Sequence, residues 1–529
     1  MIDNNLIGSS VLSVLIFLPL IFAAVILLWP QKNTVRELAF GFSIIQLAVS
    51  LFMLKDFNSA TAALQFVEKF SWIERFGISY FVGVDGISVM LVMLTTVLMP
   101  IMILGSWKSI DQKLKGFHVA LFVLQSAMLG SFLALDAVLF YVFWELSLIP
   151  MYFIIGIWGG SRRIYATVKF FIFTMTGSVL MLLAIIFMMR LTPEVTGGAI
   201  SASLLDFYKL KIPFIGNDFF TPQTLLFFAF AGAFAIKVPL FPLHTWLPDA
   251  HVEAPTPGSV VLAGVMLKMG TYCYLRWVIP LFPEASSHFA WLFISLGVIG
   301  IIYGALVAMI QPDVKKLVAY SSVSHMGYII LGLFVLNVYG VNGALYQMLN
   351  HGVSTGGLFL LIGMIYERTH SREISKYGGL ASAMPIFTIV FLIVTMSSIA
   401  VPLTNGFIGE FLILLGAYNY SPLVAACAVI GVILGAAYML WMVKKVFFGP
   451  AGEIVTQSLH DPEHALHDLS LREFSVMAPI LILILWMGLF PNTIMNYSKA
   501  SVDYLLANRQ NYSLSILQDS SKDTLEEAK

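Results

Sequence analysis

Charged residues are scarce in this chain, and their scarcity narrows what the protein can be. Lys, Arg, Asp and Glu make up 11% of the 529 residues, whereas 59% are hydrophobic. Soluble domains carry about a quarter charged residues, so this composition excludes an ordinary soluble domain. The net formal charge is zero, and no basic face for a nucleic acid is present. The sequence therefore predicts a polytopic membrane protein in contact with a lipid bilayer.

Cysteine is almost absent, which excludes two further classes of protein. The two cysteines, Cys273 and Cys427, both lie inside apolar stretches. A disulfide framework or a zinc site is therefore not expected, and we interpret both thiols as packing residues at lipid depth. The sequence also has no cysteine cluster and no G-x-G-x-x-G fingerprint. No metal and no bound cofactor are predicted on this chain.

Long hydrophobic runs are what the sequence does contain, and they predict an all-α polytopic membrane protein. A membrane-spanning helix needs about 20 consecutive apolar residues. Runs of this kind predict about fourteen helices, which begin near Ser10, Arg36, Val84, Gly116, Ala137, Tyr165, Pro222, Gly258, Trp291, Leu317, Val341, Ala383, Pro422 and Arg472.

The charges in the loops predict the orientation of these helices. Lys and Arg gather in alternate loops, for example at residues 108–115, 162–163, 315–316 and 444–445. The positive-inside rule places such loops on the cytoplasmic side. With an even number of spans, both termini are predicted on the outer side. The polar tail, residues 518–529, is predicted to be disordered.

A weak internal repeat divides the chain. Asp136–Val138 resembles Asp313–Lys315, and Lys237–Leu240 resembles Ala400–Leu403. Each repeat holds five predicted helices, and an odd number makes the second repeat enter the membrane from the other face, as in many transport proteins. The predicted division is 1–115 for three N-terminal helices, 116–285 for the first repeat, 286–450 for the second, inverted repeat, and 451–529 for the last helix and the polar tail.

One helix in each repeat is predicted to be broken. Pro239 follows Lys237 closely, while Pro402 and Gly406 precede Glu410. Proline removes a backbone donor and clashes with the preceding turn, so both helices should unwind locally. Broken backbone at membrane depth is tolerated only where protein or a wet cavity satisfies the freed groups. A charge beside each break favours a wet cavity over a kink used only for packing.

Five ionisable side chains in mid-span are the main indication of function. An isolated charge at the bilayer centre costs on the order of 3 kcal/mol by insertion scales, so such residues usually mark paths for ions or protons. The five predicted relay residues are Glu145, Lys237, Lys268, His351 and Glu410.

The types of these residues suggest how a proton would move. A Glu145 and Lys237 pair would act as a switch, because each stabilises the other's charge and separating them expels a proton. Lys268 and His351 would pass the proton laterally, and Glu410 would be the far terminus. Histidine suits a relay because its ring exchanges protons readily near neutral pH.

Each residue also has an ordinary interpretation. Glu145 and Lys268 can be members of static buried ion pairs, and His351 can be an interhelical hydrogen-bond donor. His325 is open to the same two interpretations as His351. 

Three polar residues just beyond the Lys237 break are further candidates for the relay or for proton access. These are His244, Asp249 and His251, for which a polar loop surface is the simpler explanation. Metal binding there is weakly supported, because no HExxH-type spacing appears.

Several of these motifs together resemble a known family. Phe143–Leu146, Ile236–His251, Glu253–Thr256 and Leu262–Lys268 look like the proton-pumping antiporter-like subunits of respiratory complex I, NADH:quinone oxidoreductase. The resemblance covers nearly the whole chain, and the block Ile236–His251 is highly specific. Glu410, the motif Val84–Ser88 and the absence of a long C-terminal lateral helix are similar to the subunit M, or chain 4, branch of this family.

The resemblance implies a function and a set of partners. It implies proton roles for the five relay residues, with His325 as a further candidate, and proton translocation driven by quinone reduction elsewhere in a complex. FMN, iron-sulfur clusters and the quinone site would reside on partner subunits, and the neighbours would include further antiporter-like chains in a bacterial inner membrane. The alternatives are a subunit of a multi-chain sodium/proton antiporter or of a membrane-bound hydrogenase, and a static membrane scaffold.

Overall fold

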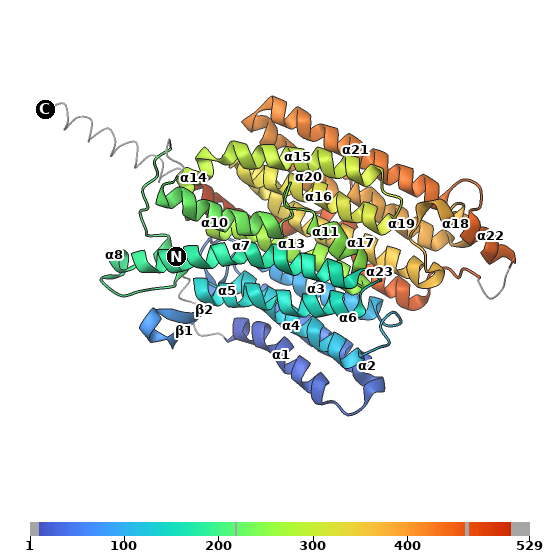
Figure 1. The fold of residues 1–529 in the computed structure, drawn as a ribbon, viewed down its shortest axis with the longest axis horizontal. Helices are drawn as coiled ribbons and strands as arrows, with labels where there is room; N and C mark the ends of the chain where they lie inside the picture. The colour runs from blue at the N-terminus through green and yellow to red at the C-terminus, as the bar shows by residue number, and fades with distance from the viewer. Residues whose placement is uncertain (1–9, 217–219, 461–464, 509–529) are drawn as a thin grey trace.

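The long helices of the molecule lie roughly parallel and side by side (Figure 1). The computed structural model describes residues 10–216, 220–460 and 465–508. In that part of the chain, eleven helices are long and apolar enough to cross a membrane, and the shorter apolar helices are Val89–Gly105, Pro222–Lys237 and Pro385–Ser398. The prediction of about fourteen spans in an all-α polytopic membrane protein is confirmed.

The elements are as follows in chain order. The first part contains α1 (Val11–Leu28), η2 (Lys32–Thr34), α2 (Val35–Asp56), β1 (Gln65–Ile73), η3 (Glu74–Phe76), β2 (Ile78–Val84) and α3 (Val89–Gly105). The middle part contains α4 (Leu114–Leu133), α5 (Ala137–Leu146), α6 (Leu148–Trp158), α7 (Arg163–Leu191), α8 (Pro193–Thr196), α9 (Leu204–Phe207), α10 (Pro222–Lys237), α11 (Trp246–Glu253), α12 (Thr256–Val261), η4 (Leu262–Met266), α13 (Leu267–Cys273), η5 (Tyr274–Val278) and α14 (Pro283–His288). The last part contains α15 (Ala290–Met309), α16 (Val314–Phe334), α17 (Val338–Thr369), η6 (Ile374–Lys376), α18 (Leu380–Ala383), α19 (Pro385–Ser398), α20 (Asn405–Tyr420), α21 (Pro422–Phe447), α22 (Glu453–His460) and α23 (Leu471–Leu489). Residues 492–508 form one more helix.

An antiparallel hairpin of β1 and β2 interrupts the helical pattern between α2 and α3. No strand was predicted there, because long apolar runs of about 20 residues do not reveal short alternating segments. The turn of the hairpin includes Gly77, whose φ of 63° favours glycine. We call the end of the bundle that carries this hairpin the hairpin face, and the other end the opposite face.

The boundaries at two other places differ from the prediction. The third span was predicted to begin near Val84, but α3 begins at Val89 because the Asp85 carboxylate accepts hydrogen bonds from the backbone N–H groups of Ile87 and Ser88 and forms a tight turn. The helix at residues 492–508 was not predicted. The predicted disordered tail, residues 518–529, lies outside the described residues.

Two aspartates mark matching positions in the two repeats. Asp136 accepts hydrogen bonds from backbone N–H groups at the start of α5, and Asp313 does the same at the start of α16. Each also forms an isolated antiparallel bridge with a distant loop, Asp136 with Ser203 and Asp313 with Glu373. Asp136 lies at the hairpin face, where it accepts a bond from the backbone N–H of Ser79 of β2. Asp313 pairs instead with Arg372, which donates to the backbone oxygen of Val252 in α11 (Trp246–Glu253). This arrangement fits inverted repeats, while the boundaries given above stay predictions.

Both predicted helix breaks are present. The first separates α10 from α11, and the Trp246 indole donates to the freed carbonyl of Ile236 at 2.9 Å. The second separates α19 from α20, and a Cβ added to Gly406 would lie 2.1 Å from the backbone oxygen of Ser397. Only glycine allows this close approach, so the chain can fold back on itself at the second break.

The span that carries Lys268 is irregular and wholly buried. Residues Thr256–Val278 form one continuous helical segment with every residue of its apolar window buried. It begins with α12, and its second α-helical part, α13, lies between two π-helical turns, η4 and η5. Such turns are rare and are frequently found at functional sites, because they release backbone groups and re-aim side chains.

Candidate functional site

Three of the five predicted relay residues and one further candidate meet where α13, α16, α17 and α20 come together. The Lys268 ammonium nitrogen lies 2.6 Å from Nδ1 of His351. The rings of His351 and His325 have centroids 5.7 Å apart. His325 Nδ1 in turn lies 3.0 Å from Oε1 of Glu410. The structure thus brings Lys268, His351, His325 and Glu410 into one buried row across α13, α17, α16 and α20.

The π-helical turn η4 positions Lys268. Besides His351, the ammonium group donates to the backbone oxygen of Ala263, which lies in that turn. A backbone carbonyl and an imidazole nitrogen are neutral acceptors, and no carboxylate forms a salt bridge with Lys268 among the described residues. The static ion-pair interpretation of Lys268 is therefore not what the geometry supports.

Glu410 is held by polar side chains from two neighbouring helices. It accepts a hydrogen bond from the Gln347 amide at 3.1 Å in addition to its contact with His325. Asn350, one turn further along α17, donates to Gln347 at 3.0 Å. Sequence reasoning missed Gln347, although its spacing before Asn350 and His351 on one helix places all three on a shared face.

Lys237 ends α10 and is almost wholly buried beside the junction of α5 and α6. Its ammonium group lies 5.0 Å from the centroid of the Trp144 ring and donates to the Ser147 hydroxyl at 3.3 Å. Trp144 and Ser147 flank Glu145, so the lysine is seated next to the carboxylate. No ion pair joins Lys237 to Glu145 in the described structure; the two interact through space.

The Glu145 carboxylate is half-buried and incompletely satisfied. Its Oε1 atom has no hydrogen-bond partner among the described residues, while the carboxylate interacts with the Ser178 side chain of α7. A buried carboxylate oxygen without a partner is costly, which suits a group that changes partner or proton. The structure therefore shows Glu145 and Lys237 without a direct contact between their charged groups.

The two lysines are linked by close helix packing rather than by a direct hydrogen bond. α13 approaches α10 so closely that a Cβ added to Gly270 would lie 2.7 Å from the Val238 side chain. The Cys273 thiol of α13 lies near Lys237. Lys237 and Lys268 are thus on two adjacent buried helices, α10 and α13.

The three access candidates beyond the first break lie in different surroundings. His244 packs against Phe241 and Tyr303, with ring centroids 5.7 and 5.1 Å away. Its Nδ1 atom has no hydrogen-bond partner among the described residues. His244 is buried at the break rather than placed on a polar loop surface.

His251 and Asp249 both belong to α11 but differ in their partners. The His251 ring is fully buried and stacks on Phe359 at 4.8 Å, and neither of its nitrogens has a partner in the described structure. Asp249 is paired with Lys169 at 2.7 Å and with Arg162 at 3.3 Å. Asp249 therefore serves as the anion of a partly exposed ion-pair group near the opposite face.

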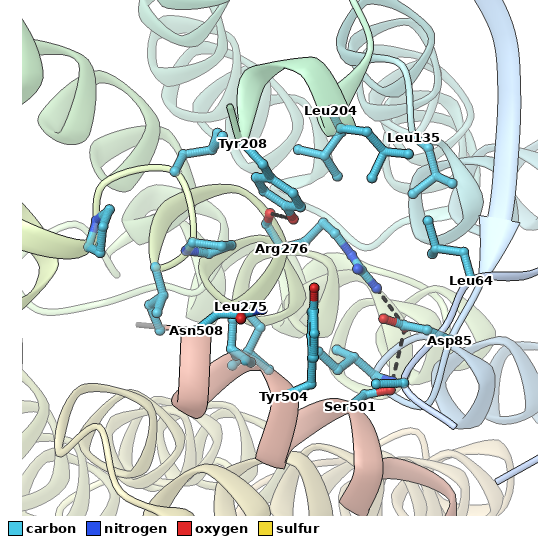
Figure 2. Close-up of a pocket in the computed structure, with 18 of the residues that line it drawn as sticks. Leu64, Asp85, Leu135, Leu204, Tyr208, Leu275, Arg276, Ser501, Tyr504 and Asn508 are labelled. Carbon is cyan, nitrogen blue, oxygen red and sulfur yellow. Dashed lines mark hydrogen bonds and ion pairs between the residues drawn. The ribbon is translucent and has the colours of Figure 1, made fainter. Parts of the chain in front are cut away.

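A cavity of about 390 Å³ lies at the hairpin face, away from the row of Lys268, His351, His325 and Glu410 (Figure 2). A buried ion pair lines this cavity, in which the Arg276 guanidinium lies 2.6 Å from the Asp85 carboxylate. The Tyr208 hydroxyl donates to the backbone oxygen of Arg276, and burial raises the pKa of Tyr208 to about 12, which keeps this donor protonated. Sequence reasoning did not select Arg276, because it lies near the end of its span.

The fold and the row of buried ionisable groups define an antiporter-like membrane protein, and two family comparisons agree. Residues 134–435 match the family described as "NADH:quinone oxidoreductase/Mrp antiporter, TM". Residues 11–135 match "NADH-ubiquinone oxidoreductase chain 4, amino terminus". The chain belongs to the subunit M, or chain 4, family of the NADH-quinone oxidoreductases.

Individual relatives cover almost the whole chain. NADH-quinone oxidoreductase subunit M of Rhodobacter capsulatus is 45% identical over 510 residues, which cover 94% of this chain and 97% of the relative. NADH-ubiquinone oxidoreductase chain 4 of Marchantia polymorpha is 42% identical over 502 residues, with 94% and 97% covered. 

Solved structures share the fold. A chain of respiratory complex I from Thermus thermophilus superimposes with a TM-score of 0.82 at 31% identity, covering 94% of this chain and 99% of that one. A chain of the Mrp complex from Dietzia has a TM-score of 0.80 at 18% identity, covering 94% and 97%, and this likeness concerns the fold alone.

Proposed function

We propose that this chain is a proton-translocating membrane subunit of an NADH:quinone oxidoreductase and that it couples quinone reduction elsewhere in the complex to proton transfer. The observation that carries the proposal is the buried row Lys268, His351, His325 and Glu410. Similarity to subunit M relatives and to a chain of complex I supports the same function. Ionisable groups at this depth are costly and usually functional.

The proposed route begins in the first repeat and ends in the second. When Lys237 and Glu145 approach, each stabilises the charge of the other, and when they separate the lysine gives up a proton. Lys268 receives that proton and passes it to Nδ1 of His351. His325 and Glu410 then carry it towards release. His244 and His251 provide access to Lys237 and Lys268, because both are buried beside the first break with unpartnered ring nitrogens. Asp249 attracts protons near the opposite face.

The surroundings of the chain are part of the proposal. The chain lies in a bacterial inner membrane, with both termini and the hairpin face outside and the opposite face towards the cytoplasm. Its partners are the other membrane subunits of the complex, including further antiporter-like chains. FMN, the iron-sulfur clusters and the quinone belong to partner subunits.

Two alternatives differ in what they predict. A multi-chain sodium/proton antiporter or a membrane-bound hydrogenase would use a related chain, but NADH-oxidising subunits would not co-purify with it. A static scaffold would use the buried charges as fixed ion pairs. The neutral partners of Lys268 favour the relay over the scaffold.

The decisive experiment uses the purified complex in proteoliposomes. Lys237→Ala removes the switch, so proton translocation and coupled quinone reduction should both fall at least tenfold while assembly is retained. Lys209→Ala is a matched control, because Lys209 is an exposed loop lysine that pairs with Asp206. If the Lys237→Ala complex acidifies vesicles at the wild-type rate, the relay is wrong. If assembly is impaired but the complex that does assemble pumps normally per electron, the scaffold is favoured.

A further inference from the structure

The cavity at the hairpin face has the size and the wall of a binding site for an amphiphilic molecule. Its volume of about 390 Å³ lies within the roughly 300–1,000 Å³ of ordinary ligand pockets. The wall is mostly leucine, isoleucine and proline, and its polar members are Asp85, Tyr208, Arg276, Ser501, Tyr504 and Asn508. An apolar pocket with a few convergent polar groups is the usual form of a small-molecule site. The proposed relay uses none of these residues.

The ion pair in the wall has hydrogen-bonding capacity left over. Asp85 accepts all of its side-chain hydrogen bonds through Oδ1, so Oδ2 has no partner among the described residues. Arg276 uses Nη2 for Asp85 and Nε for the Tyr272 hydroxyl. Nη1 carries two N–H donors, and the Tyr208 hydroxyl, which also interacts with the guanidinium, accounts for one of them at most. The pair thus offers a free acceptor and a free donor, on side chains that are only 6% and 9% exposed.

Two tyrosines mark where the cavity opens. Tyr208 and Tyr504 are 37% and 43% exposed, whereas the wall leucines Leu135, Leu204 and Leu275 are almost completely buried. Tyrosine is enriched where lipid headgroups meet the apolar core of a membrane. In Figure 2 the hydroxyl end of Tyr504 points towards the ion pair. A polar group that enters beside the tyrosines therefore meets the ion pair, while the wall around it remains apolar.

We propose that this cavity binds the headgroup of a zwitterionic phospholipid with a primary ammonium group, of the phosphatidylethanolamine class. The phosphate accepts hydrogen bonds from Nη1 of Arg276 and from the Tyr504 hydroxyl, and the ammonium donates to Oδ2 of Asp85. The glycerol and the first methylenes of the acyl chains pack against the leucines. One positive and one negative group on the lipid then match one negative and one positive group on the wall, so no unpaired charge is buried.

Other common headgroups match this wall less well. A phosphatidylcholine headgroup has no N–H to donate to Oδ2 of Asp85. A phosphatidylglycerol headgroup brings a net negative charge to a pair that is already neutral, and it also lacks the ammonium. Each of them loses a charge-assisted hydrogen bond, which corresponds to about a tenfold loss of affinity. The binding preference between headgroups therefore tests the assignment directly.

The experiment counts the lipids that the purified complex retains. The complex is reconstituted in vesicles with equal amounts of phosphatidylethanolamine, phosphatidylcholine and phosphatidylglycerol, extracted again with mild detergent, and analysed by mass spectrometry. Leu205→Trp fills the cavity from α9 and leaves Asp85 and Arg276 in place. Leu225→Trp is the matched control, because it adds the same bulk to an exposed leucine of α10 that does not line the cavity.

Wild type and Leu225→Trp should each retain one more phosphatidylethanolamine per complex than Leu205→Trp does. In that difference, phosphatidylcholine and phosphatidylglycerol should each be about tenfold rarer. Ala62→Phe is a second blocking variant from another part of the wall and should lose the same lipid, which covers the case in which Leu205→Trp does not assemble.

Three results would overturn the inference. Equal lipid content in the wild type and in both blocking variants would show that the cavity binds no lipid. A difference without preference for phosphatidylethanolamine would show an apolar site that does not read the headgroup. An experimental map with polypeptide in the cavity, from residues 509–529 or from a partner chain, would assign it to a protein segment. The inference does not rest on the proposed relay, so normal pumping by Lys237→Ala would leave it standing.

Discussion

The two members of the buried Asp85 and Arg276 pair are expected to contribute unequally to stability. Removing one partner of a buried ion pair typically costs about 3–5 kcal/mol, because it leaves an uncompensated charge. Both side chains are more than nine-tenths buried, and their atoms lie 2.6 Å apart, so the pair falls in this class. Asp85→Ala and Arg276→Met are the two perturbations.

The remaining partners decide which change costs more. Without Arg276, the Asp85 carboxylate still accepts from the backbone N–H groups of Ile87 and Ser88, so Arg276→Met should cost about 3 kcal/mol. Without Asp85, the guanidinium keeps the Tyr272 hydroxyl at 3.1 Å, and the turn before α3 loses its cap, so Asp85→Ala should cost about 5 kcal/mol. The double variant buries no unpaired charge and should be more stable than Asp85→Ala alone.

The assay is thermal denaturation of the assembled complex in detergent, together with proton translocation per electron. The order of stability should be wild type, Arg276→Met, then Asp85→Ala, with the double variant above Asp85→Ala. Translocation per electron should stay at the wild-type value, because the pair lies outside the relay. Additive destabilisation in the double variant, or equal effects of the two single changes, would refute this reasoning.

Two further changes test the geometry of the relay. Gly406→Ala places a Cβ 2.1 Å from the Ser397 backbone oxygen, so the second break must shift. The loss of stability should exceed the roughly 1–3 kcal/mol typical of overpacking, and the yield of assembled complex on native gels should fall sharply. Trp144→Leu removes the ring that faces Lys237 at 5.0 Å, which should slow proton translocation several-fold, whereas Trp144→Phe should retain most of it; equal rates for both would contradict a role of the ring.

The sequence alone was sufficient to predict the spans, the two breaks and most of the residues in the buried row. Hydropathy determines the spans, because water-free surroundings require helices of about 20 apolar residues. The same reasoning selects charges at mid-span, and so it identified Lys268, His351 and Glu410 before their contacts were visible. Proline and glycine beside a charge marked the breaks for a similar reason, since they remove backbone bonds that lipid cannot replace.

The contacts between these residues could not be predicted. Asp85 and Arg276 are 191 positions apart, and nothing in either local pattern points to the other. His325 was only an ambiguous candidate, because its position between His351 and Glu410 depends on how α16 packs against α17 and α20. Local periodicity does not specify which faces of long apolar helices meet.

The π-helical turn before Lys268 has a consequence for how the chain tolerates insertions and deletions. A residue on an α-helix is rotated by about 100° from its neighbour, so the direction of the lysine depends on the number of residues that precede it in the span. Deleting a single residue of Leu262–Met266 would restore a regular helix and turn the ammonium group away from His351. The length of this turn, and not only its composition, therefore determines whether Lys268 reaches His351.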